Sequence, residues 1–320
     1  MFRNIFYLCI GAFLAISAFA DQETIDVFFG ENPIPWTTGP LLTPSGRTEN
    51  AGHFKLQPYL NTFVKVGEYD AHWHAHSIPN FYSEQVRVLV KYGITSFLDV
   101  QVAPYVLYNE TQGRHSFNVG DLPLGFNIQL RSFKQLGSGP AIKLGFATHV
   151  PLGKYRNLHP SLLRTDISGK GCWFPEASLV VSDIWHLYGA HYIKMRSAIF
   201  YAVGVPVHVK GFNFYGGDRF TNGTVYPGNY ILFTSALEFS VTQRWVLACD
   251  FQYTHQNRDR FSGKTVAYVG RPSAEIISIA PALEYNWSRD LGMIGGVWFT
   301  LAGRNTPQFI NNIIYINAYF

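Results

Sequence analysis

Apolar and polar side chains alternate at every second position along most of this chain after its N-terminal part. Val86, Val88 and Val90 fall on one side of such a segment, whereas Arg87 and Lys91 fall on the other. This period is typical of a β-strand with one apolar face, because successive side chains of a strand point to opposite faces. The pattern therefore predicts an all-β chain whose strands separate an apolar from a polar environment.

The alternation recurs often enough to build one large antiparallel sheet of about twelve strands. Short connections alternate along the chain with long polar ones, and outer-membrane barrels have short turns at one end and long loops at the other. The segment 190–227 leaves room for two further strands. The predicted strands are 54–67, 85–93, 97–108, 120–134, 140–150, 174–186, 190–205, 228–242, 245–255, 275–287, 292–302 and 308–320.

The first twenty residues have the pattern of an export signal. Arg3 precedes an apolar stretch, which ends in Ala18-Phe19-Ala20, a small-residue cleavage site. An N-terminal membrane anchor is the alternative, but the stretch is short for a helical span of about 20 residues. We expect residues 1–20 to be a signal peptide that is removed from the mature chain.

No later segment is a continuous apolar run long enough for a helical span. If the mature chain lies in a membrane, it must form a closed barrel, because lipid cannot satisfy the open edge of a sheet. The segment 21–53 is rich in proline and glycine, so we expect it to be irregular and to lie in the periplasm or in the lumen. Residues 54–320 are predicted to form the transmembrane barrel.

Composition favours a bacterial outer-membrane protein over other exported proteins. Charged residues make up 14% of the chain and aromatic residues 16%, and the mean hydropathy of +0.02 is too low for a bundle of membrane helices. A soluble, β-rich secreted domain is the alternative. The net charge of +4 comes from scattered residues, so no nucleic-acid partner is expected.

The end of the sequence carries a further signal. Ile314, Ile316, Ala318 and Phe320 alternate on one face of the last predicted strand. A terminal aromatic residue after such a strand resembles the signal that the outer-membrane assembly machinery reads. We therefore expect two partners, the lipid bilayer and this machinery, the latter through Phe320.

Several short segments resemble the bacterial family of MetA-pathway phenol-degradation transporters. They cover about residues 117 to 320 and are Val119–Gly125, Pro140–Gly153, Leu237–Thr242 with Arg244-Trp245, Ala280–Tyr285 and Gly303–Asn305. The resemblance implies an outer-membrane β-barrel with a transport role. It implies no catalytic residue, and the family's link to phenol does not fix the solute of this chain.

Charged residues on the polar side of the strands are the candidate pore lining. Charged rings can set the ion selectivity of a pore, but the same residues can pair across strands and fill a narrow lumen. A barrel of about twelve strands lies between filled and open examples, so both alternatives stay open. The candidates are Arg87, Lys91, Asp99, Asp121, Arg131, Lys143, Glu238, Asp250 and Glu284.

Together these features predict a porin-like channel or transporter for passive passage of small solutes, with hydrophobic solutes among the candidates. The alternative is a surface-exposed structural or adhesin-type barrel with binding loops. We expect no enzyme, since no G-x-S-x-G motif occurs and His159-Pro160-Ser161 is an isolated loop motif. No cofactor is expected, and we expect no disulfide between Cys172 and Cys249.

A histidine-rich loop is the one candidate metal site. His72, His74 and His76 would share one face of an extended segment and could bind zinc or copper. The favoured interpretation is a solvated loop, because Asp70 is the only further ligand type close to them in the sequence.

Overall fold

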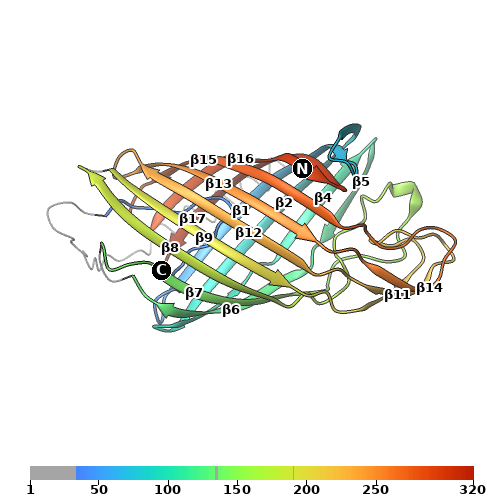
Figure 1. Cartoon of the computed structure of the whole chain (residues 1–320), viewed down its shortest axis with the longest axis horizontal. Helices are drawn as coiled ribbons and strands as arrows, with labels where there is room; N and C mark the ends of the chain where they lie inside the picture. The colour runs from blue at the N-terminus through green and yellow to red at the C-terminus, as the bar shows by residue number, and fades with distance from the viewer. Residues whose placement is uncertain (1–33, 134–135, 190) are drawn as a thin grey trace.

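The computed structural model describes residues 34–133, 136–189 and 191–320 (Figure 1). The predicted signal peptide lies outside these described residues. The large sheet contains β1 (Phe54–Tyr69), β2 (Ala75–Thr95), β3 (Leu98–Val102), β4 (Tyr105–Thr111), β5 (Arg114–Val119), β6 (Leu122–Arg131), β7 (Ala141–Val150), β8 (Glu176–Tyr188), β9 (His191–Ala202), β12 (Tyr230–Ser240), β13 (Trp245–Gln256), β15 (Ala274–Asn286), β16 (Leu291–Arg304) and β17 (Thr306–Tyr319). A smaller sheet contains β10 (Val207–Lys210), β11 (Asn222–Tyr226) and β14 (Arg260–Lys264), and a short 3-10 helix, η1, covers Pro160–Leu162.

The large sheet closes on itself. Every pairing in it is antiparallel, and β1 bonds to β17 on one side and to β2 on the other. β3 and β4 both pair with β2 and are two parts of one wall strand, and β5 and β6 are likewise two parts of the next. Counted in this way, the wall is a closed 12-strand antiparallel barrel, which confirms the predicted fold.

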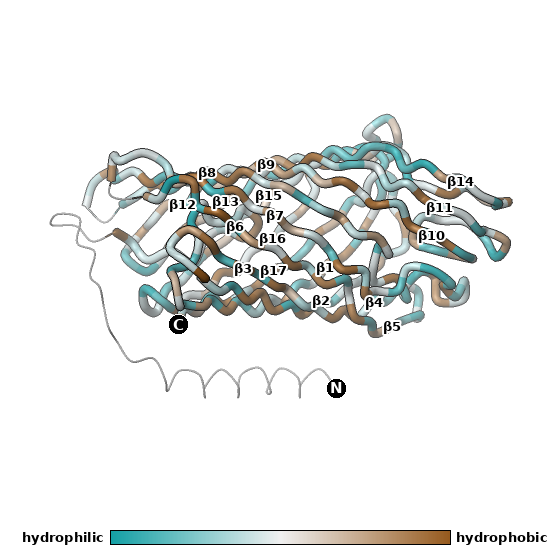
Figure 2. Tube along the Cα trace, turned by 90° about the horizontal axis from the view of Figure 1, so that it is seen from below, coloured by the Kyte–Doolittle hydropathy of each residue, from teal (hydrophilic) through white to brown (hydrophobic). Residues whose placement is uncertain are grey.

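The outer side of the wall is apolar. In β12, Leu237 is 56% exposed, whereas its neighbours Ala236 and Glu238 are each 1% exposed. Hydrophobic and hydrophilic residues alternate in this way along the strands in Figure 2. The lumen therefore receives the polar side chains and lipid contacts the apolar ones, as a period of two residues requires. No helix in the described parts of the chain is long and apolar enough to cross a membrane.

Exposed aromatic residues mark the two ends of this apolar surface. Trp185, Trp245 and Trp287 lie near the short turns, and Trp173 and Tyr201 lie near the long loops. Amphipathic rings at these two levels match the aromatic girdles of membrane barrels. By the usual orientation of such barrels, the short turns face the periplasm and the long loops face outward.

The structure corrects the prediction in the outer parts of the chain. The expected loop before residue 85 is strand, since β2 begins at Ala75 and pairs with the end of β1, where Glu68 lies opposite His76. The segment 190–227, which left room for two further strands, does contain β10 and β11, and the expected loop 256–274 contains β14; the three strands form a sheet separate from the wall. These three strands are only four or five residues long, so their alternation is too short to stand out as a strand signal in the sequence.

The small sheet continues three wall strands outward. In the wall Tyr230 pairs with Ala202 and with Gln256, and five residues further along each strand Val225 pairs with Val207 and with Phe261. In Figures 1 and 2 the small sheet lies at the end of the barrel farthest from the C-terminus. The connections between the wall and the small sheet interrupt the hydrogen bonding between strands but keep the order and the register of the strands.

Candidate functional site

An irregular segment, residues 34–50, lies within the barrel, and we call it the strap. Glu284 accepts hydrogen bonds from the backbone N–H groups of Thr38 and Gly39, the latter at 3.1 Å. The Tyr315 hydroxyl donates to the carbonyls of Gly39 and Pro40, at 2.9 and 3.0 Å. These wall side chains therefore hold the strap through its backbone.

Asp250 forms the second anchor of the strap. Its two carboxylate oxygens each accept a backbone N–H, one from Leu41 and one from Thr43, both at 2.9 Å. The Thr43 hydroxyl also donates to Asp250 at 2.7 Å and lies 2.7 Å from the hydroxyl of Thr234 on β12. Because Asp250 is fully buried, its charge is compensated mainly by these strap groups.

The far end of the strap is held on the opposite part of the wall. Asp99 accepts the backbone N–H of Glu49 at 3.0 Å, and Gln129 accepts that of Thr48 at 2.7 Å. The Glu49 carboxylate lies 3.9 Å from the ammonium group of Lys55. The strap thus crosses the lumen between carboxylates of different strands.

A buried ion pair supports the middle of the strap. The guanidinium Nε of Arg196 donates to Glu238 at 2.6 Å, and both side chains are almost fully buried. Gly39 lies against this guanidinium, since a Cβ built at position 39 would be 2.7 Å from Nη1 of Arg196. Its φ of +112° is also one that other residues rarely adopt. Only glycine fits at this crossing without moving the ion pair.

Apolar contacts complete the seat of the strap. Leu41 is 6% exposed and belongs to a buried cluster inside the barrel, which we call the cradle. Its wall members come from β1, β13, β15, β16 and β17, so the cradle is an apolar zone in an otherwise polar lumen. They are Tyr59, Ala248, Ala280, Ile294, Ile313 and Tyr315.

The outer entrance is covered by the connection between β7 and β8. Asp121, at the interruption between β5 and β6, accepts the backbone N–H groups of Gly153 and Lys170 at 2.9 and 2.8 Å. The side-chain amide of Asn109 donates to the carbonyl of Thr165 at 2.8 Å. This loop is therefore bound to inward-facing wall residues. It covers the outer entrance, and the strap crosses the lumen.

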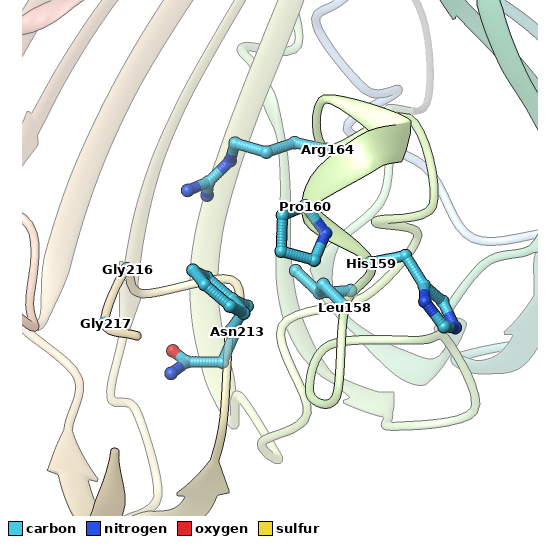
Figure 3. A pocket seen from close by; sticks show the side chains of 8 residues that line it. Leu158, His159, Pro160, Arg164, Asn213, Gly216 and Gly217 are labelled. Carbon is cyan, nitrogen blue, oxygen red and sulfur yellow. The ribbon is translucent and has the colours of Figure 1, made fainter. Parts of the chain in front are cut away.

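A small pocket lies among the outer loops (Figure 3). Arg164 crosses it and donates to the carbonyl of Phe214 at 2.7 Å. The lining contains no serine, cysteine or carboxylate, so it offers no nucleophile or carboxylate base for catalysis. It is formed by Leu158, His159, Pro160, Arg164, Phe212, Asn213, Gly216 and Gly217.

Most of the charged candidates from the sequence point into the lumen. Arg87 stacks its guanidinium 4.3 Å from the ring centre of Tyr59. Arg131 differs, because it is exposed beside the turn after β6 and donates to the carbonyl of Ser138. The buried candidates are Lys91, Asp99, Asp121, Lys143, Glu238, Asp250 and Glu284.

Sequence reasoning missed several partners of these residues. Arg196 and Lys194 lie in the region where the predicted strands were least certain, although their even spacing places both on the inward face. Asn286 donates to Glu284 at 2.7 Å, and it ends a strand whose alternation was recognised. Trp36 lies in the strap, where Arg244 is 5.7 Å from its ring centre.

The histidine-rich hairpin between β1 and β2 is organised by Asp70. This carboxylate lies 3.1 Å from Nε2 of His76 and 3.6 Å from Nδ1 of His74, and it accepts the backbone N–H of His72. The hydrogen bond with His76, followed by that from the His74 backbone, holds the pKa of Asp70 well below its usual range. Within the described ranges, no group of three or more His, Cys, Asp or Glu residues is arranged to hold a metal ion.

Cys172 and Cys249 are both free cysteines. Cys172 is buried in the outer loop, where its sulfur lies 3.3 Å from the Tyr215 hydroxyl, and Cys249 is exposed on the outer side of β13. Burial, the largest cause, raises the pKa of the Cys172 thiol, so it is not an activated nucleophile.

Comparison with known proteins identifies the architecture. No family model matches the sequence, and no curated protein matches it. The crystal structure of the COG4313 outer membrane channel from Pseudomonas putida F1 is similar at a TM-score of 0.65 and 12% identity, over 86% of this chain and 98% of that one. The chain thus has the fold of bacterial outer-membrane β-barrels.

Other solved structures are more distant. The TodX deltaS2S3 mutant monoaromatic hydrocarbon channel has a TM-score of 0.45 and 10% identity, over 85% of this chain and 91% of that one. The translocator domain of the autotransporter NalP from Neisseria meningitidis has a TM-score of 0.45 and 8% identity, over 85% of this chain and 90% of that one.

Proposed function

We propose that this protein is a gated outer-membrane channel for small solutes, and that the structure represents its closed state. The observation that carries the proposal is the strap, which crosses a lumen lined by charged and polar side chains. Hydrogen bonds from its backbone to Asp99, Asp250 and Glu284 hold it there. Such contacts can exchange for water, so the strap can leave without any change in the wall.

The pore lining of the open state follows from this proposal. Once the strap leaves, the carboxylates that anchor it would face water together with Lys91 and Lys143. Both signs of charge would then line the same passage, which argues against a strong preference for anions or cations. Arg131 would lie at the periplasmic end rather than in the narrow part.

The cradle favours solutes with an apolar part. Leu41 of the strap occupies it in the closed state, and a Cβ built at Gly296 would be 2.7 Å from Cδ1 of Leu41. A small aromatic or branched group has a size similar to a leucine side chain and could take its place. We therefore propose amphipathic solutes, whose polar part meets the charged lumen while the apolar part enters the cradle.

Transport measurements with matched solutes test this selectivity. In proteoliposomes, benzoate is expected to enter faster than glycolate, since both carry one negative charge but only benzoate has a ring. Replacing Ile294, which is fully buried in the cradle, with Asn should reduce this preference by roughly tenfold, the effect of one or two buried apolar contacts. Equal entry of both solutes into wild-type vesicles would contradict the apolar preference. It would not contradict the proposal that the protein is a channel.

Membership of the phenol-degradation transporter family is part of the proposal. The segments that resemble the family supply the contacts that close the barrel: Asp121 in one segment bonds to Gly153 in another, and Glu238 and Glu284 lie in two more. The shared fold with the Pseudomonas putida channel supports this assignment. The family's solutes are not assigned to this chain.

We also propose that Phe320 is read during membrane assembly. Its backbone N–H and carbonyl pair with Phe54, at 2.9 and 3.0 Å, and the two rings stack at 4.6 Å across the barrel seam. Phe320→Ala is expected to lower the amount of folded barrel in cells several-fold, as judged by heat-modifiable gel mobility. Refolding of the purified variant in detergent should be nearly normal; an equal loss there would assign Phe320 to seam packing instead.

A further inference from the structure

The small outer sheet has one face that is covered by the protein. Val207, Val209 and Val225 are buried and belong to a cluster that also contains Ala202 and Tyr215. Ala202 is a fully buried residue of the wall strand β9, so this cluster lies on the lumen side. The side chains that alternate with these valines must therefore point away from the barrel axis.

The outward face of this sheet is basic. Cross-strand neighbours place Lys210 beside Asn222, which in turn lies beside Lys264, and Tyr226 lies beside Arg260. Hydroxyl and amide groups fill the positions between the cations, and no carboxylate occurs on this face. Its residues are His208, Lys210, Asn222, Thr224, Tyr226, Arg260, Ser262 and Lys264.

The carboxylates of the same two connections are already engaged elsewhere. Asp259 is buried, and it bonds to Nε of Arg271 at 2.8 Å and to the backbone N–H of Gly228 at 2.8 Å. Asp218 accepts backbone N–H groups at the tips of both connections, including those of Phe220 and Ala267 at 2.7 Å. The cations on the outward face are therefore not neutralised by these acids.

The position of this face relative to the membrane is set by the aromatic residues below it. Trp173 and Tyr201 are about half exposed on the outer side of the wall, and the backbone N–H of Val205 donates to the carbonyl of Trp173 at 3.0 Å. Since β10 begins at Val207, the basic face starts directly above this aromatic level. Aromatic girdles lie at the level of the lipid headgroups.

We propose that the outward face of β10, β11 and β14 binds the phosphate- and carboxylate-bearing sugars of the glycolipid that forms the outer leaflet. This face continues the lipid-facing side of the wall outward. Its side chains therefore point laterally, toward the sugars of neighbouring glycolipid molecules. Lys and Arg provide the charge for the anionic groups. Thr, Ser and Asn provide hydrogen bonds to sugar hydroxyls, and the ring of Tyr226 provides a surface on which a sugar can stack.

Native mass spectrometry of the detergent-purified barrel with added lipopolysaccharide tests the proposal. The double variant R260Q/K264Q is expected to bind lipopolysaccharide roughly 25-fold more weakly than the wild type, since each basic residue near an anionic membrane surface contributes a factor of about five. The matched control is R114Q/R219Q, which removes one exposed charge at the start of β5 and one between β10 and β11 but none from this face, and it should bind like the wild type. Heat-modifiable mobility verifies that each variant is folded.

Two further probes decide between sources of the anion. Lipopolysaccharide from which the phosphates have been removed should bind the wild type about as weakly as intact lipopolysaccharide binds R260Q/K264Q. Soluble polygalacturonate should compete poorly, because it has no acyl chains that hold it in the detergent around the barrel. Equal losses in the test and control variants, or tighter binding of polygalacturonate than of lipopolysaccharide, would overturn the proposal; the second result would assign the face to free acidic polysaccharide.

Discussion

Reducing an engineered disulfide between the strap and the wall is expected to open the channel. The Thr43 and Thr234 hydroxyls are 2.7 Å apart, so the variant T43C/T234C places two sulfur atoms within reach of a disulfide bond of about 2.05 Å. In a planar bilayer, the oxidised variant should remain silent, and the reduced variant should show discrete conductance steps. The single variant T43C controls for the native cysteines, and its conductance should not depend on reductant.

A variant without new cysteines tests the same anchor. Asp250→Asn leaves one acceptor oxygen where the carboxylate now binds Leu41 and Thr43. Losing one charge-assisted hydrogen bond, at about 1.5–3 kcal/mol, is expected to raise the open probability about tenfold or more. Gly39→Ala, which forces a Cβ toward Arg196, should act in the same direction. If the locked and the reduced proteins conduct equally, or if neither conducts, the strap is not the gate.

Removing one partner of the buried ion pair is expected to cause the largest loss of stability. Glu238→Leu leaves the Arg196 guanidinium without the carboxylate that it now contacts at 2.6 Å, in a region where both side chains are almost fully buried. Breaking such a pair costs about 3–5 kcal/mol in the free energy of unfolding. Urea unfolding of the barrel in lipid vesicles, followed by tryptophan fluorescence, measures this loss.

The matched control is the double variant R196M/E238L, which replaces both charges with apolar side chains of similar length. It should recover most of the stability, since it leaves no unpaired buried charge. If the double variant loses as much free energy of unfolding as Glu238→Leu and Arg196→Met lose together, the two residues are not coupled. The ion pair would then stabilise the barrel only through packing.

Membrane solvation made the wall strands predictable from local sequence. Lipid on one side and a polar lumen on the other impose a period of two residues, as the exposure of Leu237 beside the buried Glu238 illustrates. Outside the membrane this constraint ends. The prediction accordingly failed for the start of β2 at Ala75 and for β14. It allowed two further strands in 190–227 but did not place β10 and β11 in a separate sheet, because their pairing depends on register carried up from the wall.

By itself, the sequence determined which residues face lipid and which face the lumen, because that choice depends only on whether a side chain is apolar or polar. Whether the lumen is open was decided by tertiary structure alone. Glu284 meets the strap at Thr38, 246 residues earlier in the chain, and Asp250 meets Thr43 across 207 residues. No periodic pattern encodes such contacts, since the strap is irregular and is bound through its backbone, which is the same for almost every residue type.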